Sequence, residues 1–279
     1  MKPDRQSRPP ISGVDLRQAP TLAAPEAILE AAGGMGIEFE PGDVERLGRY
    51  LGMLLHVNTT TNLTSVTDPA EAWRRHILDS LSLLPLIAEL PDGANVIDVG
   101  SGGGLPGLPL AITTPQVRFT LLEATGKKAD FLRAVVAEMG LANVRVHQER
   151  AERAGQDRGE RTGAGRINAH RESYDLVVAR AVGRLNTLAE LTIPFAKVGC
   201  KCALIKGEQA DAEVLEAAEA LKMLHAGHVG TIESPTGRIV VLTKISSTAR
   251  PYPRGDGEPK RVPLGGKAAG KAGSQDSED

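Results

Sequence analysis

Aromatic residues and cysteines are scarce in this chain of 279 residues. Four Phe, three Tyr and one Trp are too few for the aromatic platforms on which RRM and OB domains stack nucleic-acid bases. Cys200 and Cys202 form a C-x-C pair inside an apolar run, so their side chains would point to opposite faces of one strand. We therefore expect buried, unpaired thiols in the cytosol and no metal site.

Long apolar runs are also absent. No stretch approaches the roughly eighteen unbroken apolar residues of a membrane span, and a hydrophobic fraction of 41% with 24% charged residues is ordinary for a soluble globular protein. The first twenty residues contain Pro3, Pro9, Pro10 and Pro20 and lack the apolar core of a secretory signal. The sequence predicts a cytoplasmic protein without a membrane partner, with a disordered extension over residues 1–20.

The net charge of −2 gives no global sign of a nucleic-acid partner. Local basic clusters could still supply phosphate contacts. These clusters are Arg74-Arg75-His76, Lys127-Lys128 and Lys260-Arg261.

The N-terminal third reads as helical. Leu47, Leu51, Leu54 and Leu55 follow the spacing of an amphipathic helix over residues 43–56. A second helix follows, in which Asp68 can cap, Pro69 suits the first helical position and Glu71 completes a capping box. We expect residues 21–90 to form a small helical module.

From residue 95 short apolar runs alternate with helical stretches, the pattern of a parallel sheet covered by helices on both faces. The expected strands are Asn95–Val99, Val117–Glu123, Val144–His147, Tyr174–Ala179, Cys200–Lys206 and Ile239–Lys244, and the expected helices between them are Lys127–Met139, Leu185–Phe195 and Gln209–Met223. The pattern predicts one α/β domain over residues 91–248 with a doubly wound, mostly parallel sheet. The polar, Gly- and Arg-rich residues 153–172 read as a flexible insertion, and residues 249–279 as a largely disordered tail, at least beyond residue 264.

A glycine-rich turn follows the first of these strands. The segment 96–107 reads VIDVGSGGGLPG, a buried strand that opens into a turn where the backbone can approach a ligand closely. Gly102, Gly104 and Gly107 also form a G-x-G-x-x-G, so both a dinucleotide and S-adenosylmethionine must be weighed.

Three features favour S-adenosylmethionine. Asp98 ends the strand, where a carboxylate would repel a pyrophosphate but could receive the methionine ammonium directly or through water. The glycines begin at Gly100, directly at the strand end, and with Gly102 they leave room for a compact amino-acid moiety. The next strand ends in Glu123, where an acidic residue of an α/β nucleotide site holds the ribose hydroxyls; this last feature would also suit NAD.

Together these residues resemble one family, the ribosomal RNA small-subunit methyltransferase G proteins, also called glucose-inhibited division protein B. The resemblance covers about residues 40–264. It rests on Asn62-Leu63-Thr64-Ser65-Val66, Arg75-His76-Ile77-Leu78-Asp79-Ser80, the loop from Ile97 to Gly107, Leu121-Leu122-Glu123 with Lys127-Lys128 and Phe131-Leu132, Val178-Ala179-Arg180-Ala181, Lys206-Gly207 and Tyr252-Pro253-Arg254.

The resemblance implies a Rossmann-like class I methyltransferase that transfers a methyl group from S-adenosylmethionine to N7 of a guanine in 16S ribosomal RNA, either naked or in a small-subunit particle. By position it places these residues in the cofactor pocket: Gly100, Leu105, Glu123, Ala151, Glu152 and Arg180. Arg150 stands where the family usually has an arginine, and we expect it to contact RNA. Residues 1–20 and 153–172 depart from the family pattern.

Guanine N7 has an in-plane lone pair, so its methylation needs alignment of the reacting atoms rather than a catalytic base. Arg180 and Lys206 end predicted strands at the ligand-binding edge of the sheet, and we expect them to hold the target nucleotide. A salt-bridged strand-end charge is the alternative, about equally favoured for Lys206. Lys127 and Lys128 open a helix, where cations oppose the helix dipole, so phosphate contact is expected.

Several alternatives stay open on the sequence alone. Arg75 and His76 could reach RNA from their helix. A helix-surface role, or a packed His76 bonded to Asp79, is the alternative. A NAD-linked oxidoreductase, a non-catalytic ribosome-binding protein, and a methyltransferase with a non-RNA acceptor are the competing functions. We do not expect an oligomer.

Overall fold

The computed structural model describes residues 14–162, 165–167, 169–180 and 183–266. Its centre is a seven-stranded sheet in the order β3-β2-β1-β6-β7-β9-β8. The strands are β1 (Asn95–Val99), β2 (Arg118–Leu122), β3 (Val144–His147), β6 (Tyr174–Arg180), β7 (Ala196–Lys206), β8 (Ala226–Ser234) and β9 (Gly237–Lys244). β3, β2, β1, β6 and β7 pair in parallel, whereas β9 pairs antiparallel with β7 and β8.

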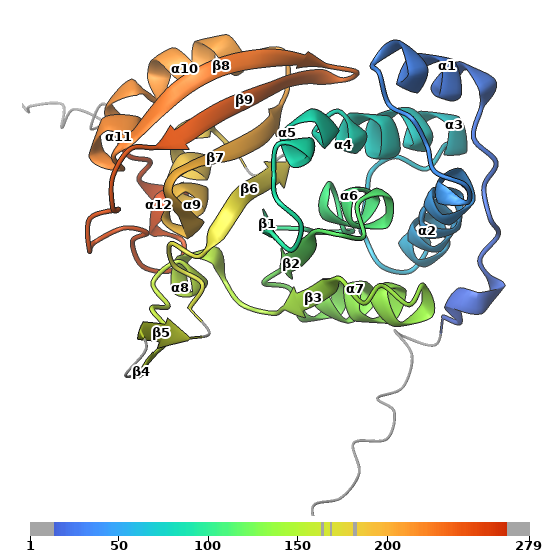
Figure 1. Cartoon of the computed structure of the whole chain (residues 1–279), viewed down its shortest axis with the longest axis horizontal. Coiled ribbons are helices and arrows are strands. Elements are labelled where there is room, and N and C mark those ends of the chain that lie inside the picture. Colours follow the sequence, from blue (N-terminus) through green and yellow to red (C-terminus); the bar gives the residue numbers. More distant parts are fainter. Residues whose placement is uncertain (1–13, 163–164, 168, 181–182, 267–279) are drawn as a thin grey trace, which may run out of the picture.

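Successive residues of the central strands belong alternately to two hydrophobic cores, one on each face of the sheet. On β1, Val96 belongs to the core on one face and Ile97 to the core on the other, as the two-residue period of a strand requires. Figure 1 shows the two helical layers, with α2, α4 and α6 to the right of the sheet and α9 to α11 to its left. A mostly parallel sheet with helices on both faces confirms the expected doubly wound α/β fold.

The helices that cover the first face come from the N-terminal region and from the first half of the α/β domain. They are α1 (Glu26–Gly34), α2 (Asp43–Asn58), α3 (Pro69–Ala72), α4 (Asp79–Leu81), α5 (Leu84–Ala88), α6 (Gly107–Thr113) and α7 (Gly126–Glu138). Leu47 and Leu51 of α2 lie in the same core as Leu108 of α6 and Val96 of β1. The N-terminal helices therefore share their core with the sheet.

The second face is covered by α9 (Leu185–Thr192), α10 (Ala210–Glu216) and α11 (Ala218–Met223), whose buried side chains meet Ile97 and Val177 in the other core. Two short helices, α8 (Ala151–Ala154) and α12 (Glu258–Arg261), lie near the carboxyl ends of the strands.

The capping box at Asp68 starts a helix, as its sequence predicts, because the Asp68 carboxylate accepts a hydrogen bond from the Glu71 amide (2.8 Å). The helix then changes to a π-helical segment over Trp73–Leu78 before α4. Such segments are rare and are frequent at functional sites. This one places the side chains of His76 and Asp79 in the protein interior, where they are 3% and 0% exposed.

The predicted disorder of residues 1–20 is wrong for residues 14–20, and residues 1–13 lie outside the described part of the chain. Leu16–Gln18 form a 3₁₀ turn, and the Arg49 guanidinium donates hydrogen bonds to the carbonyls of Leu16 (2.8 Å) and Ala19. At Gly52 a Cβ atom would lie 1.7 Å from the Pro20 carbonyl oxygen. These contacts come from α2, distant in sequence, so composition alone could not reveal them.

Strand β8 was not predicted. It pairs only through β9 at the edge of the sheet, and the side chains of Val229 and Ile232 are 58% and 49% exposed. The other strands were predicted from their apolar runs. An edge strand such as β8 can form by backbone pairing alone, without such a run.

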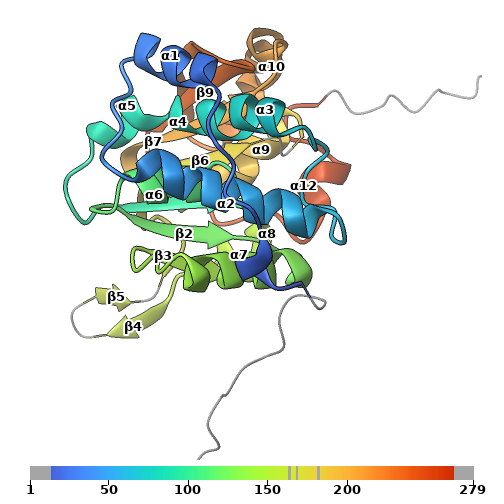
Figure 2. The ribbon, with the colours of Figure 1, turned by 90° about the vertical axis from the view of Figure 1, so that its right-hand side faces the viewer.

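The insertion is anchored at both ends, so its predicted flexibility is wrong there. Ala154 is 2% exposed, and the buried Arg171 guanidinium donates to the carbonyls of Gly155 (2.9 Å), Thr248 (2.7 Å) and Tyr252 (2.6 Å). Between these ends β4 (Glu160–Thr162) and β5 (Gly165–Ile167) form an antiparallel hairpin that projects from the body of the protein (Figures 1 and 2). Residues 163–164 and 168 lie outside the description.

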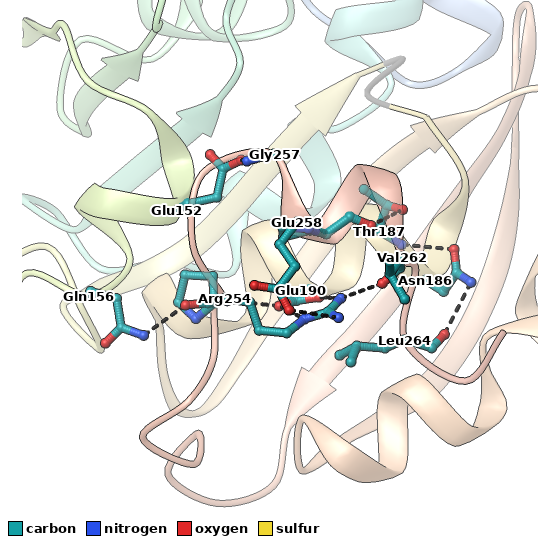
Figure 3. A network of polar contacts seen from close by, with 12 residues as sticks. Glu152, Gln156, Asn186, Thr187, Glu190, Arg254, Gly257, Glu258, Val262 and Leu264 are labelled. Carbon is teal, nitrogen blue, oxygen red and sulfur yellow. Dashed lines mark hydrogen bonds and ion pairs between the residues drawn. The ribbon is translucent and has the colours of Figure 1, made fainter. Parts of the chain in front are cut away.

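The tail also contains an ordered part, which we call the C-terminal strap, residues 249–266. Predicted disorder is wrong for this segment, whereas residues 267–279 lie outside the described chain. The Arg254 guanidinium forms a double contact with the fully buried Glu190 carboxylate of α9 (2.8 and 2.6 Å), and Leu264 is 5% exposed. Polar groups distributed along α8 and α9 hold the strap (Figure 3).

Candidate functional site

A cavity of about 590 Å³ opens at the carboxyl ends of β1 and β2, the edge where open α/β sheets bind ligands. It is lined by Val99, Gly100, Leu122, Glu123, Ala124, Glu149, Arg150, Ala151, Glu152, Gly183, Arg184, Thr187, Leu191, Gly257, Lys260 and Pro263. Of the residues predicted for the site, the cavity brings together Gly100, Glu123, Arg150, Ala151 and Glu152.

Asp98 lies beneath the glycine loop. Its side chain is fully buried, and Oδ2 accepts a hydrogen bond from the Gly107 amide (3.0 Å). A Cβ atom at Gly107 would lie 2.8 Å from this oxygen and 2.4 Å from Leu121, so only glycine allows the helix start to come this close. Oδ1 of Asp98 has no hydrogen-bond partner among the described residues.

Burial raises the pKa of Asp98 to about 7, against the opposing effect of the Gly107 amide. A buried carboxylate with one unpaired oxygen is costly to ionise unless a donor or cation arrives. This environment fits the predicted role as partner of the methionine ammonium.

Glu123 links the loop to the cavity. Its Oε2 accepts from the Gly102 amide (2.9 Å) and its Oε1 from the Thr125 amide (2.7 Å). Each carboxylate oxygen has a second lone pair, and Glu123 lines the cavity. The geometry therefore leaves acceptors for two adjacent hydroxyls, the chemistry of a ribose.

Glu152 connects the cavity to the strap. Its Oε1 accepts from the Gly257 amide (2.8 Å), as Figure 3 shows. Arg150 is half exposed, and its guanidinium lies 3.8 Å from Glu152 and 3.6 Å from Asp256. Ala151 lines the same wall, so α8 and the strap form one side of the cavity together.

Arg180 ends β6 and points toward the N-terminal helices rather than lining the large cavity. Its Nη1 donates to Nδ1 of His76 (3.4 Å), and its Nε lies 3.8 Å from Oδ2 of Asp79. Neither carboxylate oxygen of Asp79 has a hydrogen-bond partner in the described residues. Burial lowers the pKa of Arg180, with the charge of Asp79 opposing it.

The imidazole of His76 is neutral in this arrangement. Burial, followed by the nearby charge of Arg180, lowers its pKa to about 4. Because Nδ1 accepts from Arg180, Nε2 carries the proton and donates to Oγ1 of Thr64 (2.7 Å). The expected bond between His76 and Asp79 is replaced by these two contacts, which orient Arg180.

Lys206 has an internal partner. Its side chain is 7% exposed, and its ammonium lies 2.8 Å from the Glu213 carboxylate. It also donates to the Gly183 carbonyl, so it ties the backbone that leads into α9. These contacts match the salt-bridged alternative, and the expected contact with substrate stays a prediction.

The other predicted RNA contacts lie outside the cavity. Arg75 is half exposed and pairs with Glu71 (2.6 Å) on the same helix. Lys127 and Lys128 lie in the first turn of α7, with Lys127 exposed. Leu105, within the glycine loop, is partly buried against the first hydrophobic core and is not among the residues that line the cavity.

Sequence reasoning missed the part of the cavity wall made by α9 and the strap, namely Arg184, Thr187, Gly257, Lys260 and Pro263. One signal was available, because Tyr252-Pro253-Arg254 belongs to the family resemblance. A family motif within a segment whose composition is typical of disorder indicates that this segment packs against the folded domain.

The residues present fit S-adenosylmethionine. The unpaired Oδ1 of Asp98 offers an acceptor to the ammonium, Glu123 offers acceptors to the ribose, and the apolar wall at Ala151 and Leu191 suits an adenine ring. In the described residues, no group of three or more His, Cys, Asp or Glu side chains could hold a metal ion. Within the same residues, we find no helix with the length and hydropathy of a membrane span.

Comparison with known proteins agrees with this chemistry. The family model described as rRNA small subunit methyltransferase G matches residues 43–238. The ribosomal RNA small subunit methyltransferase G of Sorangium cellulosum is 47% identical, with 83% of this chain and 92% of the relative covered. The protein of the same name from Moorella thermoacetica is 39% identical, with 82% and 93% covered.

Among solved structures, a SAM-dependent methyltransferase from Aquifex aeolicus is similar with a TM-score of 0.47 and 17% identity, over 64% of this chain and 94% of that one. The family model and the relatives confirm the resemblance seen in the sequence. The chain belongs to the rRNA small subunit methyltransferase G family.

Proposed function

We propose that this protein transfers the methyl group of S-adenosylmethionine to N7 of a guanine in 16S ribosomal RNA. Family membership carries this conclusion and confirms the expected enzyme class, an rRNA methyltransferase that uses S-adenosylmethionine. The same membership rules out the NAD-linked alternative considered for the glycine loop. The observation in the fold that supports the cofactor is the buried Asp98 with its unpaired oxygen beside Gly107.

In this proposal each residue has a defined task. Asp98 receives the methionine ammonium, Glu123 holds the ribose hydroxyls, and Ala151 with Glu152 borders the adenine. When bound, the cofactor supplies an electrophilic methyl group on a sulfonium. Guanine N7 would bond to this methyl carbon with its own lone pair while the carbon–sulfur bond breaks and sulfur keeps that electron pair as a neutral thioether, so no residue has to remove a proton from N7.

Arg180 is the proposed contact to the acceptor nucleotide. Its guanidinium is 17% exposed and carries five N–H donors, of which His76 accepts only one. A guanidinium held from behind by His76 and Asp79 can present its remaining donors to the guanine O6 or to a phosphate. Orientation of this kind supplies much of the rate enhancement when two reactants must align.

The acceptor is proposed to be 16S rRNA within a small ribosomal particle, and the enzyme is proposed to act as a cytoplasmic monomer. The test is to incubate purified protein with labelled S-adenosylmethionine and either 30S particles or naked 16S rRNA, and to analyse the nucleosides by mass spectrometry. Labelled 7-methylguanosine is the expected product. Cofactor binding without transfer to either RNA substrate would reject the proposal, and label on another nucleoside would correct the acceptor atom.

An Arg180→Ala variant separates the acceptor role from a cofactor role. Loss of transfer with unchanged affinity for S-adenosylmethionine is expected. Loss of cofactor binding as well would assign Arg180 to the cofactor pocket, which is the role that the family resemblance implies.

A further inference from the structure

The C-terminal strap is fixed against the cavity by contacts to its main chain. Thr187 Oγ1 donates to the Pro259 carbonyl (3.1 Å), Asn186 Nδ2 to the Leu264 carbonyl (3.1 Å), and the Gly257 amide to Glu152 (2.8 Å). Figure 3 shows these contacts around the Arg254–Glu190 pair. The strap thereby holds Lys260 at the cavity wall.

Two cations, Lys260 and Arg184, line this part of the cavity. Lys260 is exposed and forms no ion pair with any residue in the described parts of the chain. Arg184, at the start of α9, is 75% exposed, and its nearest carboxylate is that of Glu216 at 3.8 Å, itself 59% exposed. An exposed ion pair of this length contributes little to stability. The side chains of Lys260 and Arg184 are therefore both available to an external anion.

The cofactor does not supply that anion. The charged groups of S-adenosylmethionine are the ammonium, the carboxylate and the sulfonium, all at the methionine end, whereas the adenosine is neutral. Glu152, the proposed adenine neighbour, bonds directly to the strap through Gly257. Lys260, three residues after Gly257 in the strap, therefore lies on the side of the cavity proposed for the neutral adenosine, and Arg184 lines the same cavity.

We propose that the C-terminal strap and the start of α9 together form an RNA-backbone contact surface, in which Lys260 and Arg184 bind phosphates of the acceptor RNA at the mouth of the cofactor cavity. The inference rests on the proposed function, because RNA is the substrate that brings phosphates to this edge. Lysine and arginine contacts to phosphate position a nucleic acid without reading its sequence. Lys260 belongs to one of the basic clusters seen in the sequence, and Arg150, an expected RNA contact, lines the same cavity. The expected contacts at Arg75, Lys127 and Lys128 lie outside it.

The test compares the double variant Lys260→Ala/Arg184→Ala with wild type and with Lys222→Ala as matched control. Lys222 is exposed on α11 and forms no ion pair among the described residues. Dissociation constants for 30S particles are measured between about 50 and 200 mM salt. The slope of log affinity against log salt is expected to fall by about 1.5 in the double variant, since each lost phosphate contact removes about 0.7–0.9, and to stay unchanged in Lys222→Ala.

The affinity for S-adenosylmethionine and the melting temperature are measured on the same proteins, and both are expected to remain at wild-type values. An unchanged salt slope would overturn the proposal, and weakened cofactor binding would assign the two cations to the cofactor instead. The charge-removing pair Lys260→Gln/Arg184→Gln repeats the test with uncharged polar side chains that are longer than alanine. Failure of the proposed function would show separately, as absence of methyl transfer by the wild type.

Discussion

The guanidinium of Arg180 donates to the neutral imidazole of His76, which in turn donates to Thr64. This chain of donors runs from the carboxyl end of β6 into the N-terminal helices, so the N-terminal region takes part in the site. Asp79, one helical turn after His76, supplies the only carboxylate within 4 Å of Arg180 among the described residues. The orientation of Arg180 therefore depends on residues about one hundred positions away.

Asp79→Asn is expected to destabilise the protein by about 3 kcal/mol, because removal of one partner leaves a largely buried charge without compensation. Methyl transfer should fall further than the loss of folded protein explains, since Arg180 loses its fixed position. Chemical denaturation and turnover per folded molecule measure the two effects. The control is Glu71→Gln, which breaks exposed ion pairs with Arg74 and Arg75 and should leave stability nearly unchanged. Equal behaviour of the two variants would contradict the assigned role of Asp79.

The raised pKa of Asp98 makes stability depend on pH. Its folded value of about 7 lies above the ordinary value of 3.8, so the folded state binds more protons between these values, and stability falls as pH rises from about 4 to 7. The loss amounts to about 4 kcal/mol at most. Denaturant melts of the ligand-free protein at several pH values should show this trend, and Asp98→Asn should lack it.

Cofactor affinity should change in the opposite direction. Ionised Asp98 attracts the methionine ammonium. The affinity ratio of wild type to Asp98→Asn is expected to rise by about tenfold between pH 6 and 8, because the ionised fraction of a carboxyl group with a pKa of about 7 rises by about that factor. Taking the ratio cancels the titration of the ligand itself. Calorimetric titration with S-adenosylmethionine gives both constants, and a ratio independent of pH would remove Asp98 from the ammonium site.

Glu123→Ala is expected to weaken the binding of S-adenosylmethionine by about 10- to 100-fold. The change removes acceptors from the ribose and leaves the Gly102 and Thr125 amides without their partner, at about 1.5–3 kcal/mol for charged hydrogen bonds. Glu149→Ala is the control, because Glu149 also lines the cavity but accepts no hydrogen bond from the glycine loop. Binding measured by calorimetry should separate them, and similar losses in both would indicate a nonspecific charge effect.

Arg254→Ala should release the strap. Glu190 is fully buried and would lose its partner, so a loss of about 3 kcal/mol is expected. Amide exchange should rise in the strap more than in the central strands, and the affinity for S-adenosylmethionine should fall with it. Arg261→Ala, an exposed change in the same segment, serves as the control. Unchanged exchange in Arg254→Ala would show that the strap is held by its other contacts.

The central strands β1 and β6 were predictable because each is a mostly apolar run whose residues are buried on both faces of the sheet. The glycine loop with Asp98 and Glu123 was equally visible. A ligand that the backbone must approach closely requires glycines at the strand end and carboxylates at defined positions after the strands, and this pattern can be read in the sequence. Residues 14–20 and the strap were misjudged for one physical reason. Their order comes from Arg49, Arg171 and Glu190, side chains far away in the sequence, rather than from local composition.

The position of Arg180 was predicted, but its surroundings were not. The sequence pattern placed Arg75 and His76 together on one helix surface. Within the π-helical segment over Trp73–Leu78, His76 is buried and Arg75 is exposed. Lys260 was visible in the sequence as part of a basic cluster, but its place in the cavity wall was not, because Lys260 enters the site only after the strap folds back onto α9.

The strap is recognised mostly through its backbone: Arg171, Gln156, Thr187 and Asn186 all donate to its carbonyl groups or to those just before it. It therefore behaves as a peptide ligand of the rest of the chain, kept bound by the high effective concentration that covalent linkage provides. Because the contacts are made to backbone carbonyl groups, most side chains of the strap can change while its backbone keeps the same position. One side of the cofactor cavity can thus diverge in sequence without loss of shape, provided that the groups that grip it are retained.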